Sequence, residues 1–143
     1  MCMAVYLGSD IELPTSKWDK NKPSFYAENA QEDDNVKKQF TKKNIYYLGS
    51  HEGCGCGFSY DDNEVNPEYS EEVKDNELRK DSVKHLVQYL KNALEKTTEL
   101  ELFICWEGEQ GEKPNKRATI TVEEILGTYW SLDTREFYKV IKK

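Results

Sequence analysis

Residues 44–60, with the sequence NIYYLGSHEGCGCGFSY, are the stretch around which we expect the rest of the chain to be arranged. Residues 45–48 are β-branched, aromatic and apolar, which is typical of a strand, and the polar, glycine-bearing cluster at 49–53 is typical of a turn. Over residues 53–58, three glycines then alternate with two cysteines and a phenylalanine. The stretch therefore predicts a β-hairpin, with the glycines on one face of its second strand and the thiols on the other.

Gly53, Gly55 and Gly57 leave that face of the predicted second strand without side chains. Glycine weakens a strand and usually marks a bulge or a close approach of other atoms to the backbone. We therefore expect a helix, an aromatic side chain or a ligand to lie against these glycines.

Five further stretches carry strand patterns: residues 2–7, 23–28, 100–106, 117–120 and 137–141. Residues 2–7 are apolar on both faces, which indicates a strand in the middle of a sheet, covered on both sides. Residues 107–116 contain two glycines and a proline, and they predict a hairpin loop that joins 100–106 to a return strand at 117–120.

Residues 82–96 carry the clearest helix pattern, with Asp81 as its N-cap. The apolar residues of this helix form one continuous stripe at Val83, Leu86, Val87, Leu90 and Leu94. Shorter helices are predicted at 34–40 and from Thr121, and residues 61–80 are predicted to be a loop or a loosely held helix. The pattern predicts one α+β domain over residues 1–143, with a single mixed, largely antiparallel sheet and two or three helices packed on it.

The excess of acidic over basic side chains limits the classes of partner that the protein is expected to bind. The chain has 27 acidic and 20 basic side chains and a net charge of −7, which opposes binding to nucleic acid and favours a basic protein partner. No apolar run reaches the length of a membrane-spanning helix, and the first residues lack the features of a secretory signal. The four cysteines are too few for a disulfide-rich exported domain, so reduced thiols and a cytoplasmic location are expected.

His51, Cys54 and Cys56 are the candidate metal ligands of the chain. Their residue types suit zinc or a softer metal ion. In a regular strand the two cysteines would lie about 6.5 Å apart, so the backbone must bend at Gly55 for them to share one ion, and a disulfide between them would be strained. A fourth ligand would have to come from Cys2, Cys105, His85 or a carboxylate.

Three classes of function follow from these residues. The first is a non-catalytic interaction or binding protein without a cofactor, in which the hairpin thiols pack as small hydrophobic side chains. The second is a zinc-binding domain that uses His51, Cys54 and Cys56. The third is a small thiol-dependent enzyme or redox sensor, with a cysteine–histidine pair or with Cys2 as an N-terminal nucleophile after removal of Met1.

Overall fold

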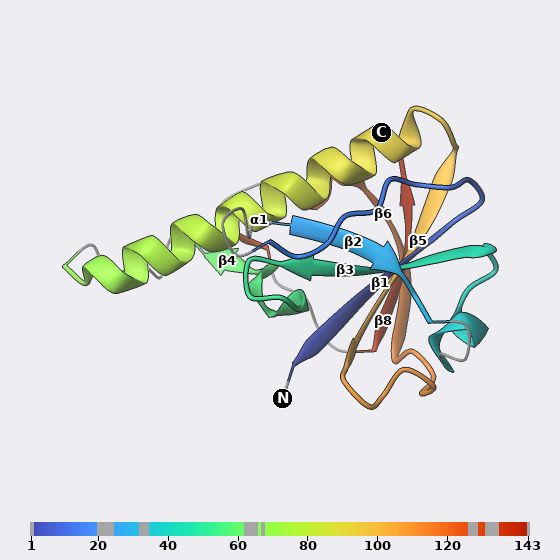
Figure 1. The fold of residues 1–143 in the computed structure, drawn as a ribbon, viewed down its shortest axis with the longest axis horizontal. Helices are drawn as coiled ribbons and strands as arrows, with labels where there is room; N and C mark the ends of the chain where they lie inside the picture. Colours follow the sequence, from blue (N-terminus) through green and yellow to red (C-terminus); the bar gives the residue numbers. More distant parts are fainter. Residues whose placement is uncertain are drawn as a thin grey trace.

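The computed structural model describes residues 2–19, 25–31, 35–61, 66, 68–125, 129–130 and 135–142. These residues form a six-stranded sheet, a short two-stranded sheet and one long α-helix that lies across one side of the larger sheet (Figure 1). The strands of the large sheet are β1 (Met3–Ser9), β2 (Phe25–Asn29), β3 (Asn44–Ser50), β5 (Glu99–Trp106), β6 (Lys116–Thr121) and β8 (Glu136–Ile141). The small sheet pairs β4 (Tyr60–Asp61) with β7 (Tyr129–Trp130).

The strand order of the large sheet is β2-β3-β1-β5-β8-β6. Every neighbouring pair is antiparallel except β6 and β8, which are parallel, so the sheet is mixed and largely antiparallel, as the sequence predicts. The predicted placement of the first strand in the middle of the sheet is also confirmed, because β1 lies between β3 and β5.

The predicted hairpin between β5 and β6 is wrong, because β8 lies between these two strands. Residues 136–140 of β8 are buried at every position except Lys139, whereas β6 exposes Lys116, Arg117 and Thr119. The more apolar strand takes the interior position, and the charged strand forms the edge of the sheet, where unpaired backbone groups can face water.

The described residues contain one α-helix, α1 (Ser70–Leu94), so the expected two or three helices are not confirmed. The two shorter stretches with helix patterns form 3₁₀ turns, η1 (Asn35–Gln39) and η3 (Val122–Ile125). Four or five residues are too few for a stable α-helix, because fixing the first turn costs more than its few hydrogen bonds return.

Helix α1 starts earlier than the sequence pattern predicts, so Asp81 lies inside it rather than at its N-cap. Its C-terminal half packs on the sheet, and its N-terminal half extends beyond the strands (Figure 1). Glu71 and Glu72 in the first turn suit the positive end of the helix dipole. The ion pair between Arg79 and Asp75, four residues apart, adds local support where few apolar contacts are made.

The core lies on both faces of the large sheet. On the side of α1, Leu100, Leu102 and Ile104 of β5 pack with Leu86 and Leu90 of the helix. The smaller cluster on the opposite face consists of Ala4, Tyr6, Val36, Ile45, Phe103, Cys105 and Phe137. The central strands are therefore buried on both sides, as their continuous apolar sequences indicate.

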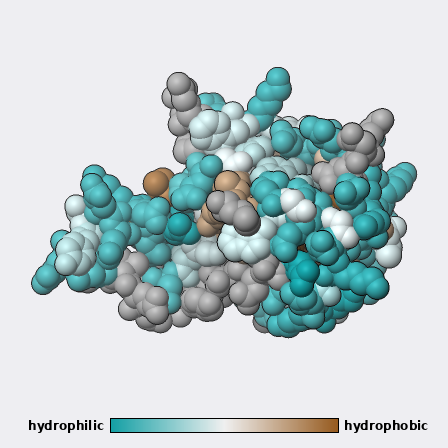
Figure 2. Space-filling view, turned by 90° about the horizontal axis from the view of Figure 1, so that it is seen from below, coloured by the Kyte–Doolittle hydropathy of each residue, from teal (hydrophilic) through white to brown (hydrophobic). Residues whose placement is uncertain are grey.

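The surface is mostly polar. The face shown in Figure 2 is dominated by hydrophilic residues, including those of the projecting part of α1. Within the described ranges, the exposed large hydrophobic side chains are Trp18, Tyr69 and Leu78. No helix in these ranges has both the length and the apolar character needed to cross a lipid bilayer.

Candidate functional site: a three-cysteine cluster

The glycine- and cysteine-rich stretch does not form the predicted second hairpin strand. After β3 the chain turns at Gly53, whose φ is +82°, and then forms the 3₁₀ turn η2 (Gly55–Gly57). Only glycine adopts this positive φ without strain. Glycine at alternate positions therefore serves a tight turn here, and not the bare face of a strand.

The buried hydroxyl of Ser50 holds this turn together. It donates to the carbonyl oxygen of Cys54 at 2.6 Å. It also accepts hydrogen bonds from the backbone amides of Gly57 at 3.0 Å and of Glu52 at 3.3 Å. One side chain thus binds backbone groups just before η2 and at its last residue, and it fixes the positions from which the two cysteines project.

Gly55 is closely covered, as expected, but by strand β1 and not by a helix, an aromatic side chain or a ligand, and nothing lies within 4 Å of a Cβ built at Gly53. A Cβ atom at Gly55 would lie 2.6 Å from Cγ2 of Val5 and 3.0 Å from the carbonyl oxygen of Met3. The turn therefore rests directly on the backbone at the beginning of β1. This contact brings the residue that precedes β1, Cys2, next to the two cysteines of the turn.

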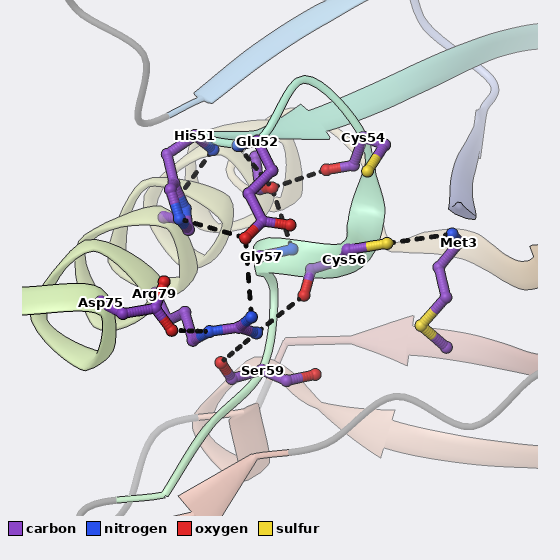
Figure 3. A network of polar contacts seen from close by, with 11 residues as sticks. Met3, His51, Glu52, Cys54, Cys56, Gly57, Ser59, Asp75 and Arg79 are labelled. Carbon is purple, nitrogen blue, oxygen red and sulfur yellow. Dashed lines mark hydrogen bonds and ion pairs between the residues drawn. The ribbon is translucent and has the colours of Figure 1, made fainter. Parts of the chain in front are cut away.

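Cys2, Cys54 and Cys56 form a cluster of three free thiols. Their Sγ atoms all lie within 4.8 Å of one another. The backbone amide of Met3 donates to Sγ of Cys56 at 3.2 Å, across the contact between β1 and the turn (Figure 3). Cys54 is buried, Cys56 is half-buried and Cys2 is exposed, so the cluster is accessible from one side.

The pKa of the Cys54 thiol is raised to about 12, chiefly by burial. A hydrogen bond from the Cys56 backbone lowers it, and contacts with the Cys56 and Cys2 thiols raise it; that value includes all of these effects. Without a bound cation the Cys54 thiol is therefore neutral at pH 7. A metal ion would have to displace its proton, as in other thiolate sites.

His51 is directed toward α1 and away from the thiol cluster (Figure 3). Its Nδ1 lies 2.9 Å from Oγ of Ser82, and its backbone amide donates to the same hydroxyl at 3.1 Å. Its Nε2 lies 3.8 Å from Oε1 of Glu52. Burial lowers the pKa of the imidazole, which favours the neutral ring at pH 7. The structure therefore brings together two of the three predicted metal ligands, and it places Cys2 beside them rather than His51.

A second group of metal-ligand types, His51, Glu52 and Asp75, lies next to the turn. Arg79 of α1 is already paired with both carboxylates: its Nε lies 2.7 Å from Asp75 Oδ2, and its Nη2 lies 3.6 Å from Glu52 Oε1. Its Nη1 donates to the carbonyl oxygen of Cys56 at 2.9 Å. This group is thus an ion-pair network that attaches the cysteine turn to α1.

The other proposed fourth ligands lie elsewhere. Cys105 is fully buried in the apolar cluster on the face of the sheet opposite α1. His85 is exposed on α1, where its Nδ1 lies 2.8 Å from the carbonyl oxygen of Asp81. Among the residues that the structure describes, the cluster of ligand atoms around Cys54 and Cys56 has only Cys2 as a third member.

The sequence pattern gives no indication of two residues that shape this site. Ser50 is a residue type common in turns, and Arg79 lies in a segment with few apolar residues, so neither residue is marked as part of a site. A signal for Arg79 exists only in its spacing from Asp75, which is typical of an ion pair on a helix. Comparison of the chain with protein-family models, with curated proteins and with solved structures gave no match.

Proposed function

We propose that this protein is a non-catalytic metal-binding protein that holds one zinc ion, or a softer ion, between Cys2, Cys54 and Cys56. The observation that carries the proposal is the approach of three Sγ atoms to within 4.8 Å of one another from two distant parts of the chain. With a zinc–sulfur distance of about 2.3 Å, sulfur ligands of one ion lie roughly 4 Å apart. Small side-chain rotations would therefore bring the cluster to ligand geometry.

Simple core packing accounts for Cys105 but not for the cluster. Cys105 has no exposed surface and lies among apolar side chains, as a buried free cysteine commonly does. Cys2 is exposed and yet lies against two other thiols. An exposed thiol gains little from burial of apolar surface, so its place in the cluster favours a chemical role.

The two histidines support a binding role over thiol catalysis. A cysteine nucleophile usually has a histidine base within hydrogen-bond reach. Nδ1 of His51 contacts Ser82 and its Nε2 faces Glu52, while His85 lies against Asp81 of its own helix. Neither imidazole is placed to take a proton from a clustered thiol.

A redox sensor is the second candidate, because the same three thiols are free and close together. Two of them would form a disulfide when a peroxide accepts their two electrons and two protons and is reduced to water or an alcohol. The exposed Cys2 is the thiol that an oxidant would reach first. Both candidates require reduced thiols at rest, which fits the expected cytoplasmic location.

Metal titration of the reduced, untagged protein tests the proposal. Elemental analysis after zinc loading should give one ion per chain in the wild type and in Cys105→Ala, which removes the unclustered thiol. Binding should be lost in the double variant Cys54→Ser/Cys56→Ser and strongly weakened in Cys2→Ser. A reduced protein that binds no zinc would refute the proposal, and formation of one disulfide by dilute peroxide in that protein would favour the redox sensor.

The expected basic protein partner remains a prediction. The surface that favours it is the projecting N-terminal half of α1, which exposes Glu71, Glu72 and Glu77. Charge complementarity of this kind mainly accelerates association and sets specificity.

A further inference from the structure

We propose that the metal ion held by the three cysteines keeps one coordination position open to solvent and binds a small thiol there as an exogenous fourth ligand. This inference rests on the proposed metal-binding function. Zinc and cobalt(II) in thiolate sites are four-coordinate, and sites with three protein ligands leave the fourth position to water or another molecule.

The first step is the number of ligands. In the described ranges, no histidine, aspartate, glutamate or further cysteine joins the three sulfurs within 4.8 Å. The acidic residue Glu107 adjoins Cys2, because its backbone amide donates to the Cys2 carbonyl oxygen at 2.8 Å. Its carboxylate, however, lies 3.4 Å from the Tyr47 hydroxyl and 3.0 Å from Nε2 of Gln110. It is thus directed to those two side chains.

The second step is that the neighbouring groups on α1 and the turn are held by other partners. Ser82 binds His51, and Arg79 binds Glu52 and Asp75. The turn itself is fixed by the Ser50 hydroxyl and by the contact of Gly55 with β1. Supplying a fourth ligand from this side would require several of these contacts to break.

The third step is the direction of the open position. Cys54 is buried and Cys56 is half-buried, so these two sulfurs lie on the protein side of the cluster. Cys2 is exposed. An ion bound by all three sulfurs would therefore meet solvent on the side of Cys2, where a small molecule can reach it.

The fourth step is the chemistry of the ligand. Three thiolates and one divalent ion carry a net charge of −1. Because the thiolates donate electron density to the ion, it would be a weak Lewis acid and would hold a water ligand weakly. Soft ions prefer soft donors. The guanidinium group of nearby Arg79 contacts carbonyl and carboxylate oxygens and not sulfur. A thiol is therefore the favoured exogenous ligand: the bound water leaves, the thiol binds as a thiolate, and its proton passes to solvent.

Cobalt(II) in place of zinc gives the test, because its visible and near-ultraviolet absorption reports the ligands. The cobalt-loaded wild type should show a saturable change in its d–d bands when 2-mercaptoethanol is added, and its sulfur-to-cobalt charge-transfer band should grow in the ratio of four sulfur ligands to three. Ethylene glycol, the analogue with oxygen in place of sulfur, should have no effect. Cys105→Ala should behave as the wild type, and gel filtration must show that cobalt stays bound.

The outcomes separate this inference from the proposed function. Stoichiometric cobalt binding with a spectrum that does not respond to the thiol would overturn the open position and leave the metal site intact. A starting spectrum that changes in His51→Asn would also overturn it, because His51 would then be the fourth ligand. Failure of cobalt and zinc to bind at all would refute the proposed function and this inference together.

Discussion

Gly55 shows how strongly a single residue constrains the candidate site. It lies between Cys54 and Cys56, and it lets the turn rest on the backbone of β1. A regular strand would hold the two thiols apart, whereas the 3₁₀ turn that begins at Gly55 brings them together beside Cys2. The absence of a side chain at this residue is therefore a condition for the cluster.

Gly55→Ala is expected to destabilise the fold by about 1 to 3 kcal/mol, the usual cost of forcing an extra group into a packed site. The added methyl group would lie 2.6 Å from Cγ2 of Val5. Gly111→Ala is the matched control, because its methyl group would meet nothing closer than the flexible end of Lys38, at 3.3 Å, and Cβ of Asn35, at 3.4 Å. Urea unfolding of both variants measures the difference, and equal stability would contradict the close contact with β1.

The His51 imidazole should make stability depend on pH. Burial lowers its pKa from the ordinary value of 6.5, so the unfolded chain binds a proton more readily than the folded chain. The stabilisation is complete above pH 6.5, declines as the pH falls toward the folded-state pKa, and is lost below that pKa.

His51→Gln removes this titration and keeps a polar side chain near Ser82. Urea unfolding from pH 8 to pH 5, with a chelator present, should show a shallower loss of stability in His51→Gln than in the wild type. Parallel curves for the two proteins would mean that His51 has the same pKa in the folded and unfolded chains.

The sequence reveals only part of the site at this scale. Cys54 and Cys56 can be recognised as a pair because they flank a glycine that permits a bend. The orientation of His51 cannot be predicted, because it depends on Ser82, which lies 31 positions away in the sequence. Cys2 can be considered as a ligand, but its place beside the turn follows from the packing of β1 under Gly55, which no local pattern encodes.

Among the secondary-structure elements, α1 combines a packed half and a projecting half. The apolar stripe from Val83 to Leu94 predicts the packed half correctly, since its residues are buried against the sheet. The pattern leaves residues 61–80 open between a loop and a loosely held helix, because residues 70–81 carry many charges and few apolar residues, and the structure shows the helix from Ser70 onward. The order of β5, β8 and β6 is missed for a similar reason: hydrophobicity identifies the strands, but neighbours along the chain need not be neighbours in the sheet.

Leu90→Ala should lower the free energy of unfolding by about 2 to 5 kcal/mol, because a fully buried leucine loses its transfer free energy and leaves a cavity. Lys84→Ala, at an exposed position of the same helix, should change it by less than about 0.5 kcal/mol. Denaturant unfolding of both variants makes the comparison. A cost below about 1 kcal/mol for Leu90→Ala would show that the stripe does not face the core.

Arg79→Met tests whether α1 positions the cysteine turn. The change removes the hydrogen bond of 2.9 Å to the Cys56 carbonyl oxygen and keeps most of the apolar part of the side chain. Zinc affinity should fall roughly 10- to 100-fold, as is typical when a group that orients a ligand is lost. The fold should persist, because partly exposed ion pairs contribute little to stability.

Lys74→Met is the control for Arg79→Met, since it removes an exposed positive charge from the same helix. Competition with a chromophoric chelator measures zinc affinity in both variants. An equal loss of affinity in the two would point to the overall charge of α1, and unchanged affinity in Arg79→Met would show that the turn holds its shape without the helix.

For the molecule as a whole, the thiol cluster adds a second link between the beginning of β1 and the cysteine turn, which already meet at Gly55. Cys2 belongs to the beginning of the central strand β1, and the turn with Cys54 and Cys56 is attached to α1 through Arg79. An ion bound by all three sulfurs would tie the sheet to the helix-bound turn. In the unfolded chain Cys2 is far from the other two cysteines, so the complete site exists only in the folded state.

Zinc should therefore stabilise the whole fold by mass action. A ligand that binds only the folded state at 100 times its Kd adds about 2.7 kcal/mol to the free energy of unfolding, and residual binding of zinc by the Cys54–Cys56 pair in the unfolded chain would reduce this gain. Urea unfolding of the reduced protein should show this gain on adding zinc, a complete return with a chelator, and no gain with magnesium, which prefers oxygen ligands. The variant Cys54→Ser/Cys56→Ser should gain nothing from zinc. An equal gain in that variant would place the stabilising ion at another site, while a wild type that zinc does not stabilise would separate the thiol cluster from metal binding altogether.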